Sequence, residues 1–250
     1  MSESIELLGV GVNSLNYDWA LKKVIRWAQL RDSRYICIAN VHMLMEAYDS
    51  PGFKGVVNDA DLVTPDGMPL VWMMRVKGKR DQQRVYGPTL MLHVLEAAAR
   101  ENIPVGFYGG APPVLESLVA RMRVRFEGLN VAFYLSPPFR ELSPQEDAEM
   151  IQSIIDSGAR ILFVGLGCPK QEIWMANHRE KVSAVMLGVG AAFDFHAGVK
   201  PQAPGWMQSA GLEWLFRFIR EPGRLWKRYL FHNPRFVLLA VGDLLGLKKF

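Results

Sequence analysis

The chain has 250 residues, of which half are hydrophobic and 22% are charged. This composition is typical of a globular protein with a sizeable core, and it excludes a largely disordered chain. Two cysteines, Cys37 and Cys168, are too few for a disulfide framework or a cysteine-based zinc site, which favours a reducing compartment. The N-terminal segment lacks the pattern of a secretory signal peptide, and no apolar run approaches the length of about 20 residues that spans a membrane. We therefore expect a protein that is neither exported by this route nor membrane-spanning.

Apolar, β-branched runs alternate with stretches of helical period along the first 200 residues. In chain order they predict strand Ile5–Val12, helix Trp19–Leu30, strands Tyr35–Ala39 and Leu62–Thr64, helix Thr89–Glu101, strand Val105–Tyr108, helix Val114–Phe126, strand Val131–Leu135, helix Pro144–Ser157, strand Ile161–Gly165, helix Gln171–Glu180 and strand Val185–Val189. Nearly continuous apolar strands separated by helices indicate an α/β protein with a mostly parallel sheet and helices on both faces.

The last fifth of the chain has a different character. Residues 201–250 contain eight Lys and Arg against three acidic residues, although the formal net charge of the whole chain is only +4. From Trp206 onward the pattern is amphipathic helix only, rich in aromatic residues and broken at Pro222 and Pro234. We therefore predict a domain of residues 1–200 and a helical appendage of residues 201–250 that meets an anionic partner or a membrane surface.

Open α/β sheets bind their ligands at the carboxyl ends of the strands. Polar or glycine-rich segments follow five of the predicted strands: Ala39–His42, Thr64–Gly67, Tyr108–Gly110, Gly165–Glu172 and Gly188–His196. We expect the functional site to be built from these segments.

Three of these strand exits carry side chains with more than one interpretation. Asp66 could accept a proton from an acceptor hydroxyl in the cleft, or it could cap a helix that begins near Pro69. Gly165–Glu172 could place a phosphate at a helix N-terminus, or it could be an ordinary turn with a capping Glu. Asp194 and His196 could form an acid–base pair or contact a ribose, or Asp194 could hold the loop backbone.

Several kinds of site find no support in the sequence. Neither the dinucleotide Gly-x-Gly-x-x-Gly pattern, the Walker pattern nor the Gly-x-Ser-x-Gly elbow is present. Asp59-Ala60-Asp61 matches the Asp-x-Asp metal motif of many nucleotide-sugar transferases, but it precedes a strand rather than following one. The histidines show no metal-binding spacing. We expect no metal site and no cofactor.

Distinctive sequence blocks occur in a fixed order along almost the whole chain: Asn40, Thr64–Trp72, Phe107–Gly110, Gly165–Glu172, Gly188–Phe195, Gly211–Arg217 and Glu221–Arg224. In these blocks the chain resembles the WecG/TagA/CpsF glycosyltransferases, glycosyltransferase family 26. Two positions differ from the common family pattern, because Ile38 and Gln202 stand where many members have Thr and Arg.

The resemblance implies a Rossmann-like catalytic domain with a basic C-terminal appendage. It implies an inverting, metal-independent transfer from a UDP-sugar, with an N-acetylmannosamine-, mannosaminuronate- or glucose-type sugar, to a polyprenyl-diphosphate-linked sugar. The setting would be bacterial surface polysaccharide biosynthesis, with a cytoplasmic protein peripheral on the inner face of the cell membrane. Nucleic acid is not an expected partner, and a homo-oligomer is left open.

Residue type, position and resemblance together suggest roles for individual side chains. Asp66 is the expected catalytic base. Because the departing diphosphate must be stabilised without a metal, a clamp of cations is expected. The clamp consists of Arg217 and Arg224, with Lys227 and Arg228 beside them. The expected donor contacts are Asn40, Gly167, Gln171 and Asp194, with Lys170 also assigned to the substrate site.

Two other functions stay open at this point. A dinucleotide-dependent oxidoreductase could be built on the same fold, although the glycine fingerprint is missing. The basic tail could instead make the protein a non-catalytic module that binds nucleic acid or a membrane.

Overall fold

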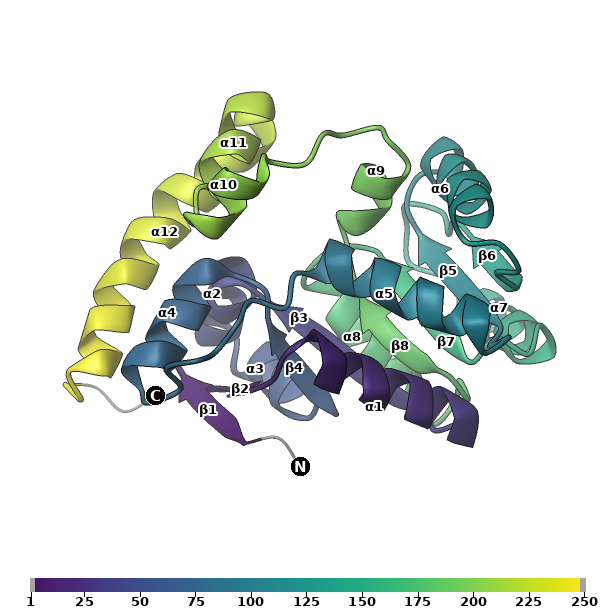
Figure 1. Ribbon diagram of the computed structural model, residues 1–250, viewed down its shortest axis with the longest axis horizontal. Coiled ribbons are helices and arrows are strands. Elements are labelled where there is room, and N and C mark those ends of the chain that lie inside the picture. Colours follow the sequence, from purple (N-terminus) through teal and green to yellow (C-terminus); the bar gives the residue numbers. More distant parts are fainter. Residues whose placement is uncertain (1–2, 248–250) are drawn as a thin grey trace. The chain divides into compact units, whose positions relative to one another are not determined.

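The computed structural model describes residues 3–247, apart from the side chains of Arg224, Lys227 and Arg228. The chain divides into two compact units, whose elements are labelled in Figure 1. The first unit comprises Met1–Asn16, Cys37–Tyr86 and Gln202–Phe250, and the second comprises Tyr17–Ile36 and Gly87–Pro201. Residues 202–250 thus share a unit with residues 37–86. The predicted division at residue 200 separates a catalytic domain from an appendage by their roles, and it stays a prediction.

The first unit begins with a β-hairpin. Strands β1 (Ser4–Leu7) and β2 (Val10–Asn13) pair antiparallel, so the single strand predicted over Ile5–Val12 is wrong. The chain reverses at Leu8 and Gly9, which both have positive φ, 52° and 80°. Glycine adopts this left-handed conformation without steric cost, and two such residues form the tight turns that join antiparallel strands.

Two short helices of the first unit were not predicted, α2 (Val41–Asp49) and α3 (Pro51–Asn58), whereas α4 (Met68–Val76) begins close to Pro69, where the sequence left a helix open. Helix α2 buries Met43, Leu44, Met45 and Ala47, and most residues of α4 are apolar. All three helices have only eight or nine residues, which is too short for a helical period to stand out in the sequence. Strand β4 (Leu62–Pro65), which lies between α3 and α4, agrees with the prediction.

The C-terminal part of the first unit is helical, with α10 (Gly205–Ser209), α11 (Glu213–Arg220) and α12 (Pro222–Leu244). Pro222 begins α12, in agreement with the break predicted there, but the break predicted at Pro234 is wrong because α12 continues through it. A proline inside a helix costs about 3 kcal/mol. Burial of one face, which includes Leu225, Tyr229 and Phe236, stabilises the uninterrupted helix.

Helix α12 packs against α2 and α4 within the first unit (Figure 1). Near its C-terminal end, the Asp243 carboxylate accepts hydrogen bonds from Lys77 Nζ at 2.7 Å and from the Leu8 backbone N–H at 3.3 Å. Over residues 3–247, no helix combines the length and the apolar character needed to cross a bilayer.

The second unit contains the alternating strands and helices that the sequence predicts. They are α1 (Tyr17–Leu30), α5 (Gly87–Arg100), β5 (Val105–Gly109), α6 (Pro112–Arg125), β6 (Val131–Leu135), α7 (Pro144–Asp156), β7 (Ile161–Gly165), α8 (Lys170–His178) and β8 (Val185–Gly188). The short helix α9 (Ala192–His196), which follows β8, was not predicted. Strand β3 (Arg34–Ala39) belongs to both units, and its residues Arg34 to Ile36 pair with β8.

Hydrogen bonding orders the six strands β4-β3-β8-β7-β5-β6, and the pairs β3–β8, β8–β7, β7–β5 and β5–β6 are parallel. Every residue of β5 and β8 is buried, as expected for strands covered on both faces. The predicted α/β, Rossmann-like fold with a C-terminal helical part is confirmed. In a sheet of this order, the carboxyl ends of neighbouring strands collect the loops that carry function.

Candidate active site

The exits of β3 and β4 meet in the first unit. The backbone N–H groups of Asp66 and Gly67 both donate to the carbonyl oxygen of Ala39, at 2.9 and 3.3 Å. A Cβ atom at Gly67 would lie 3.4 Å from Cα of Asn40, so a small residue suits this approach. The N-cap residue of α4 is Gly67 rather than Asp66. The Asp66 carboxylate is therefore placed beside Asn40, at the carboxyl ends of two strands.

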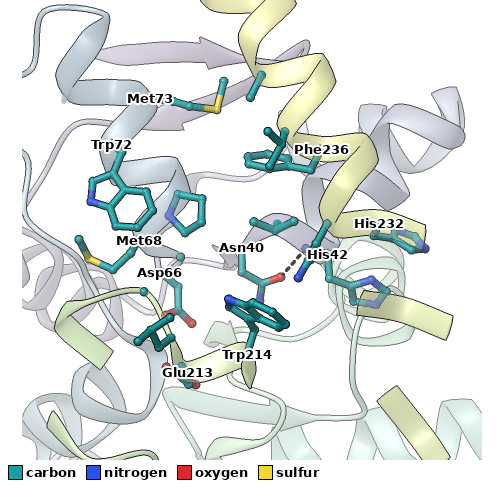
Figure 2. Close-up of a pocket in the computed structure, with 18 of the residues that line it drawn as sticks. Asn40, His42, Asp66, Met68, Trp72, Met73, Glu213, Trp214, His232 and Phe236 are labelled. Atoms are coloured by element: carbon teal, nitrogen blue, oxygen red, sulfur yellow. Dashed lines mark hydrogen bonds between the residues drawn. The ribbon is translucent and has the colours of Figure 1, made fainter. Parts of the chain in front are cut away.

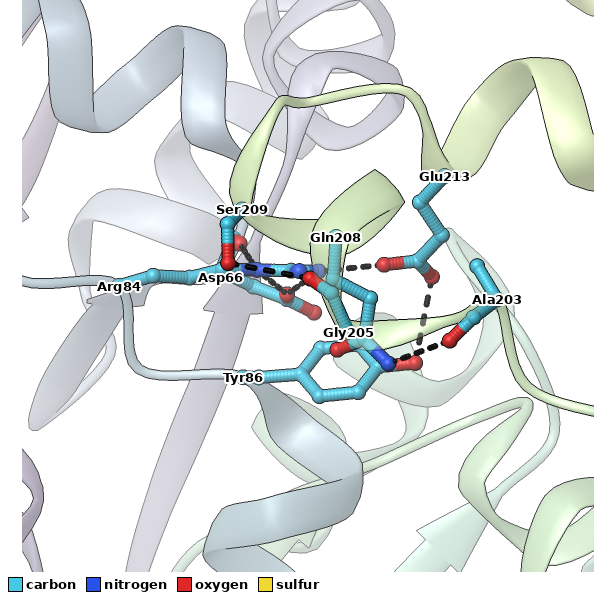
Figure 3. Close-up of polar contacts among 8 residues, drawn as sticks. All are labelled: Asp66, Arg84, Tyr86, Ala203, Gly205, Gln208, Ser209 and Glu213. Atoms are coloured by element: carbon cyan, nitrogen blue, oxygen red, sulfur yellow. Dashed lines mark hydrogen bonds and ion pairs between the residues drawn. The ribbon is translucent and has the colours of Figure 1, made fainter.

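Asp66 belongs to a network of charged and polar side chains (Figure 3). Its Oδ1 accepts hydrogen bonds from Nη2 of Arg84 at 2.8 Å and from Nε at 3.2 Å, and Arg84 Nε also donates to the Asp66 carbonyl oxygen. Arg84 Nη2 reaches Glu213 Oε2 at 2.7 Å, and the Tyr86 hydroxyl donates to Glu213 Oε1 at 3.2 Å. The guanidinium lies over the Tyr86 ring, 4.0 Å from its centroid. One arginine thus joins the strand-exit carboxylate to the first turn of α11.

The network holds defined protonation states. Burial alone lowers the pKa of Arg84, but the nearby carboxylates of Asp66 and Glu213 outweigh it and raise that pKa above its ordinary value. Burial, with the charge of Glu213 as the next cause, raises the pKa of Tyr86 above its ordinary value. Arg84 therefore stays positively charged, and Tyr86 stays a neutral phenol that donates a hydrogen bond to Glu213. These groups orient Asp66 without exchanging protons near neutral pH.

A cavity of about 610 Å³ opens beside this network within the first unit. Figure 2 shows Asp66 and Glu213 in one part of it, with Trp72, Met73 and Phe236 around another. The apolar walls come from α4 and α12, and the polar lining includes Asn40, His42, Arg84, Arg217 and His232. The cavity therefore combines an acidic, hydrogen-bonding end with a long apolar surface.

Three of the predicted site residues, Asn40, Asp66 and Arg217, line this cavity. The Asn40 side-chain oxygen accepts hydrogen bonds from the backbone N–H groups of His42 at 3.0 Å and Met43 at 3.3 Å. Because that oxygen caps α2, a contact from Asn40 to the UDP-sugar has to use the amide NH₂ group of the side chain. Arg224, Lys227 and Arg228 belong to α12, but their side chains lie outside the described part of the structure.

The other predicted residues belong to the loop and first turn of α8 in the second unit. Gly167, at φ +81°, has open space where a Cβ would stand, whereas a Cβ at Gly165 would lie 2.6 Å from the Phe193 ring. Gly165 is thus needed for packing rather than for ligand approach. Gln171 is buried, with its Oε1 accepting from Gly167 N–H at 3.2 Å and its Nε2 donating to Glu172 at 2.7 Å. Lys170, the first residue of α8, is exposed.

Asp194 and His196 lie on α9 of the second unit, and their side chains have separate partners. Asp194 pairs with Lys200 at 2.8 Å, and its backbone carbonyl accepts from the N–H groups of Val199 and Lys200. His196 Nε2 lies 2.9 Å from the carbonyl oxygen of Pro88, and burial lowers the pKa of this imidazole. The acid–base pair considered from the sequence is therefore not formed between these two side chains.

The main residues that sequence reasoning missed are Arg84 and Tyr86. Both lie in the segment between α4 and α5, where no helical or strand period marks them. Glu213 stood inside the family block Gly211–Arg217, but nothing in the local sequence pairs it with Arg84. A search for cations able to neutralise Asp66 would have had 29 Lys and Arg to choose from.

Comparisons with known proteins agree with the resemblance. A model described as the glycosyl transferase WecG/TagA/CpsF family matches residues 5–250. The chain is 31% identical over 204 residues to an N-acetylglucosaminyldiphosphoundecaprenol N-acetyl-beta-D-mannosaminyltransferase from Bacillus spizizenii. The aligned region covers 81% of this chain and 77% of the relative. The family match extends over both units of the fold.

Proposed function

The chain belongs to the WecG/TagA/CpsF family of glycosyltransferases, and from this premise we propose that it transfers a sugar from UDP to a polyprenyl-diphosphate-linked sugar, with inversion at the anomeric carbon. Among the donors considered, the name of the Bacillus relative favours an N-acetylmannosaminyl group, and it favours an N-acetylglucosaminyl lipid as the acceptor. The product would extend a lipid-linked glycan for a surface polysaccharide.

The observation that carries this proposal is the position of Asp66. Its carboxylate lies at the end of β4, held by Arg84, on a cavity that continues along apolar side chains of α4 and α12. An acceptor that joins a sugar to an isoprenoid chain through a diphosphate needs a polar end and an apolar surface in one site. A base for the sugar hydroxyl and a path for the lipid are thus available in the same cavity.

The reaction requires one base. The acceptor hydroxyl oxygen attacks the anomeric carbon, the bond from that carbon to UDP breaks, and the hydroxyl proton passes to the Asp66 carboxylate. No covalent enzyme intermediate is needed, because inversion takes a single displacement. Arg84 keeps the carboxylate oriented, and Glu213 shares the charge of Arg84, so the guanidinium does not neutralise Asp66 alone.

The departing UDP carries negative charge that has to be stabilised. We assign this role to Arg217, which lines the cavity, together with Arg224 and the neighbouring Lys227 and Arg228. Arginine binds diphosphate oxygens through paired N–H donors, which supports a step that does not depend on Mg²⁺. Gly167, Gln171 and Asp194 remain the proposed donor contacts of the second unit, and Lys170 remains assigned to the substrate site.

The acceptor is anchored in a membrane, so we propose that the protein acts as a peripheral protein on the cytoplasmic face. Helix α12 exposes several large apolar side chains, which include Leu230, Phe231, Val237, Leu238 and Val241. Trp206 and Ile219 of α10 and α11 are each 67% exposed. Exposed apolar groups on a basic helix are typical of an interfacial helix.

The test is a panel of UDP-sugars assayed for UDP release, with and without a lipid-diphosphate N-acetylglucosamine acceptor. Asp66→Asn is expected to lower turnover by roughly 10²–10⁴-fold while UDP binding is retained, because the amide keeps the shape but does not accept the proton. Asp59→Asn is the matched control, since Asp59 is an exposed carboxylate of the same unit that does not line the cavity.

Two results would contradict the proposal. If no UDP-sugar releases UDP in an acceptor-dependent manner, the reaction class is wrong for this chain. If Asp66→Asn keeps more than about a third of the turnover, Asp66 is not the base, and Asp194 is the next carboxylate to test.

A further inference from the structure

A second polar cluster lies on the same cavity, where α2 faces α12. His42 and Glu46 are one helical turn apart on α2, and His232 comes from α12, as Figure 2 shows for the two histidines. The imidazole rings of His42 and His232 have their centroids 5.7 Å apart, and His42 Nδ1 lies 3.6 Å from Glu46 Oε1. One ligand atom from each of the three residues lies within 4.8 Å of the other two.

We propose that His42, Glu46 and His232 bind a divalent transition-metal ion, with Zn²⁺ as the preferred ion. Two imidazoles and one carboxylate are ligands that Zn²⁺ accepts, and three protein ligands leave a fourth position open. Mg²⁺ and Ca²⁺ prefer oxygen ligands and fit this set poorly. Ligand atoms around a tetrahedral Zn²⁺ lie about 3.4 Å apart, so the three ligand atoms, which lie within 4.8 Å of one another, would move closer together on binding.

The surroundings of His232 support the assignment. Its Nδ1 is buried and accepts or donates no hydrogen bond within the described part of the chain. A buried polar nitrogen without a partner costs free energy, and a metal ion would satisfy it. Glu46 supplies the negative charge that compensates the ion, and its side chain is only 33% exposed.

The two helices that carry the cluster are also joined by a neighbouring ion pair. One turn further along the same two helices, Arg235 of α12 contacts Asp49 of α2 through both guanidinium nitrogens, at 2.7 and 2.5 Å. This pair adds to the packing of α12 on α2, which involves no metal. The three ligands are thus presented from elements whose separation is already set, which lowers the cost of ordering the site.

The metal would connect parts of the chain that are far apart in sequence. The separation of His42 and His232 along the chain matches no metal-binding motif, so the sequence alone predicts no site there. In the fold the ion would tie α12, a wall of the cavity, to α2. Because His42 and His232 both line the cavity, an exchangeable fourth ligand would reach the ion from there. The role is a structural tie with an exchangeable fourth ligand, and it is separate from the proton transfer assigned to Asp66.

The experiment titrates Co²⁺, a spectroscopic substitute for Zn²⁺, into full-length, tag-free protein freed of metal by a chelator. We expect one equivalent to bind with the visible absorption of a low-coordinate Co²⁺ site, Zn²⁺ to displace it, and Zn²⁺ to raise the Tm. His232→Gln and Glu46→Gln are each expected to weaken binding by at least about 10–100-fold, the range known for residues that only support a metal ligand. His93→Gln is the matched control, because His93 packs against Tyr17 in the second unit.

The proposal is overturned if the wild-type protein binds no stoichiometric Co²⁺, or if the two variants bind it as tightly as His93→Gln does. Equal Tm values of the metal-free wild type and variants would show that a lost metal signal is not a folding defect. Since each readout measures metal binding rather than sugar transfer, failure here leaves the proposed glycosyltransferase function untouched.

Discussion

Glu172, in the first turn of α8, offers a quantitative test of the packing around the proposed donor contacts. It has no exposed surface, its Oε1 accepts from Gln171, and its Oε2 has no hydrogen-bond partner among the described residues. Burial raises the pKa of this carboxyl from 4.5 to about 7, against the opposing effect of hydrogen bonds that include Gln171. The folded protein therefore favours a protonated Glu172.

The sign and size of the effect on stability follow from these two pKa values. Between pH 4.5 and 7 the folded state holds a proton that the unfolded chain has lost, so the contribution of Glu172 to stability falls as the pH rises through this window. The resulting penalty is about 1 kcal/mol at pH 5 and about 3 kcal/mol at pH 8. Glu172→Gln removes the ionisation and keeps the shape, so it should remove this pH-dependent penalty.

The assay is thermal unfolding of the wild type and Glu172→Gln at pH 5 and pH 8. The Tm of the variant relative to the wild type is expected to increase by roughly 4–8 °C from the lower to the higher pH. Glu149→Gln, at an exposed position on α7 of the same unit, should give no comparable increase. A Tm difference that is the same at both pH values would refute the reasoning, since Glu172 would then be ionised in the fold without cost.

Three further outcomes are expected. Arg84→Gln removes the guanidinium that pairs with the largely buried carboxylates of Asp66 and Glu213, and it should lower the free energy of unfolding by about 3 kcal/mol. Adding Glu213→Gln should restore part of this loss, and no recovery in denaturant unfolding would contradict the network. Sugar transfer, followed as UDP release, should proceed with Mg²⁺ and Mn²⁺ withheld; a requirement for either ion would disprove the arginine clamp. Leu238→Glu on α12 should reduce sedimentation with anionic vesicles several-fold, whereas Val124→Glu should not, because Val124 is an exposed apolar residue of α6 and lies outside α12; identical losses would exclude α12 as the docking face.

Local patterns determined much of the fold. Strands β5, β7 and β8 are nearly continuous apolar runs because both faces of a parallel sheet are covered. Each strand shows this property in its own sequence, without reference to its neighbours. The position of Asp66 at a strand end has the same local origin, because the strand before it and Gly67 after it are both recognisable in the sequence. The family blocks added the reaction class, which no periodicity carries.

Only the tertiary structure decided which distant side chains meet. The sequence places Arg84 in an unpatterned segment and Glu213 far beyond it, yet both contact one another in the network around Asp66. His42 and His232 likewise come together only because α12 packs on α2. Helical and strand periods report which face of an element is buried, but they contain no information about the partner that buries it. Pro234 shows the converse: its local preference to end a helix is outweighed by the burial of Tyr229 and Phe236 on either side of it, a gain that exists only once α12 is packed.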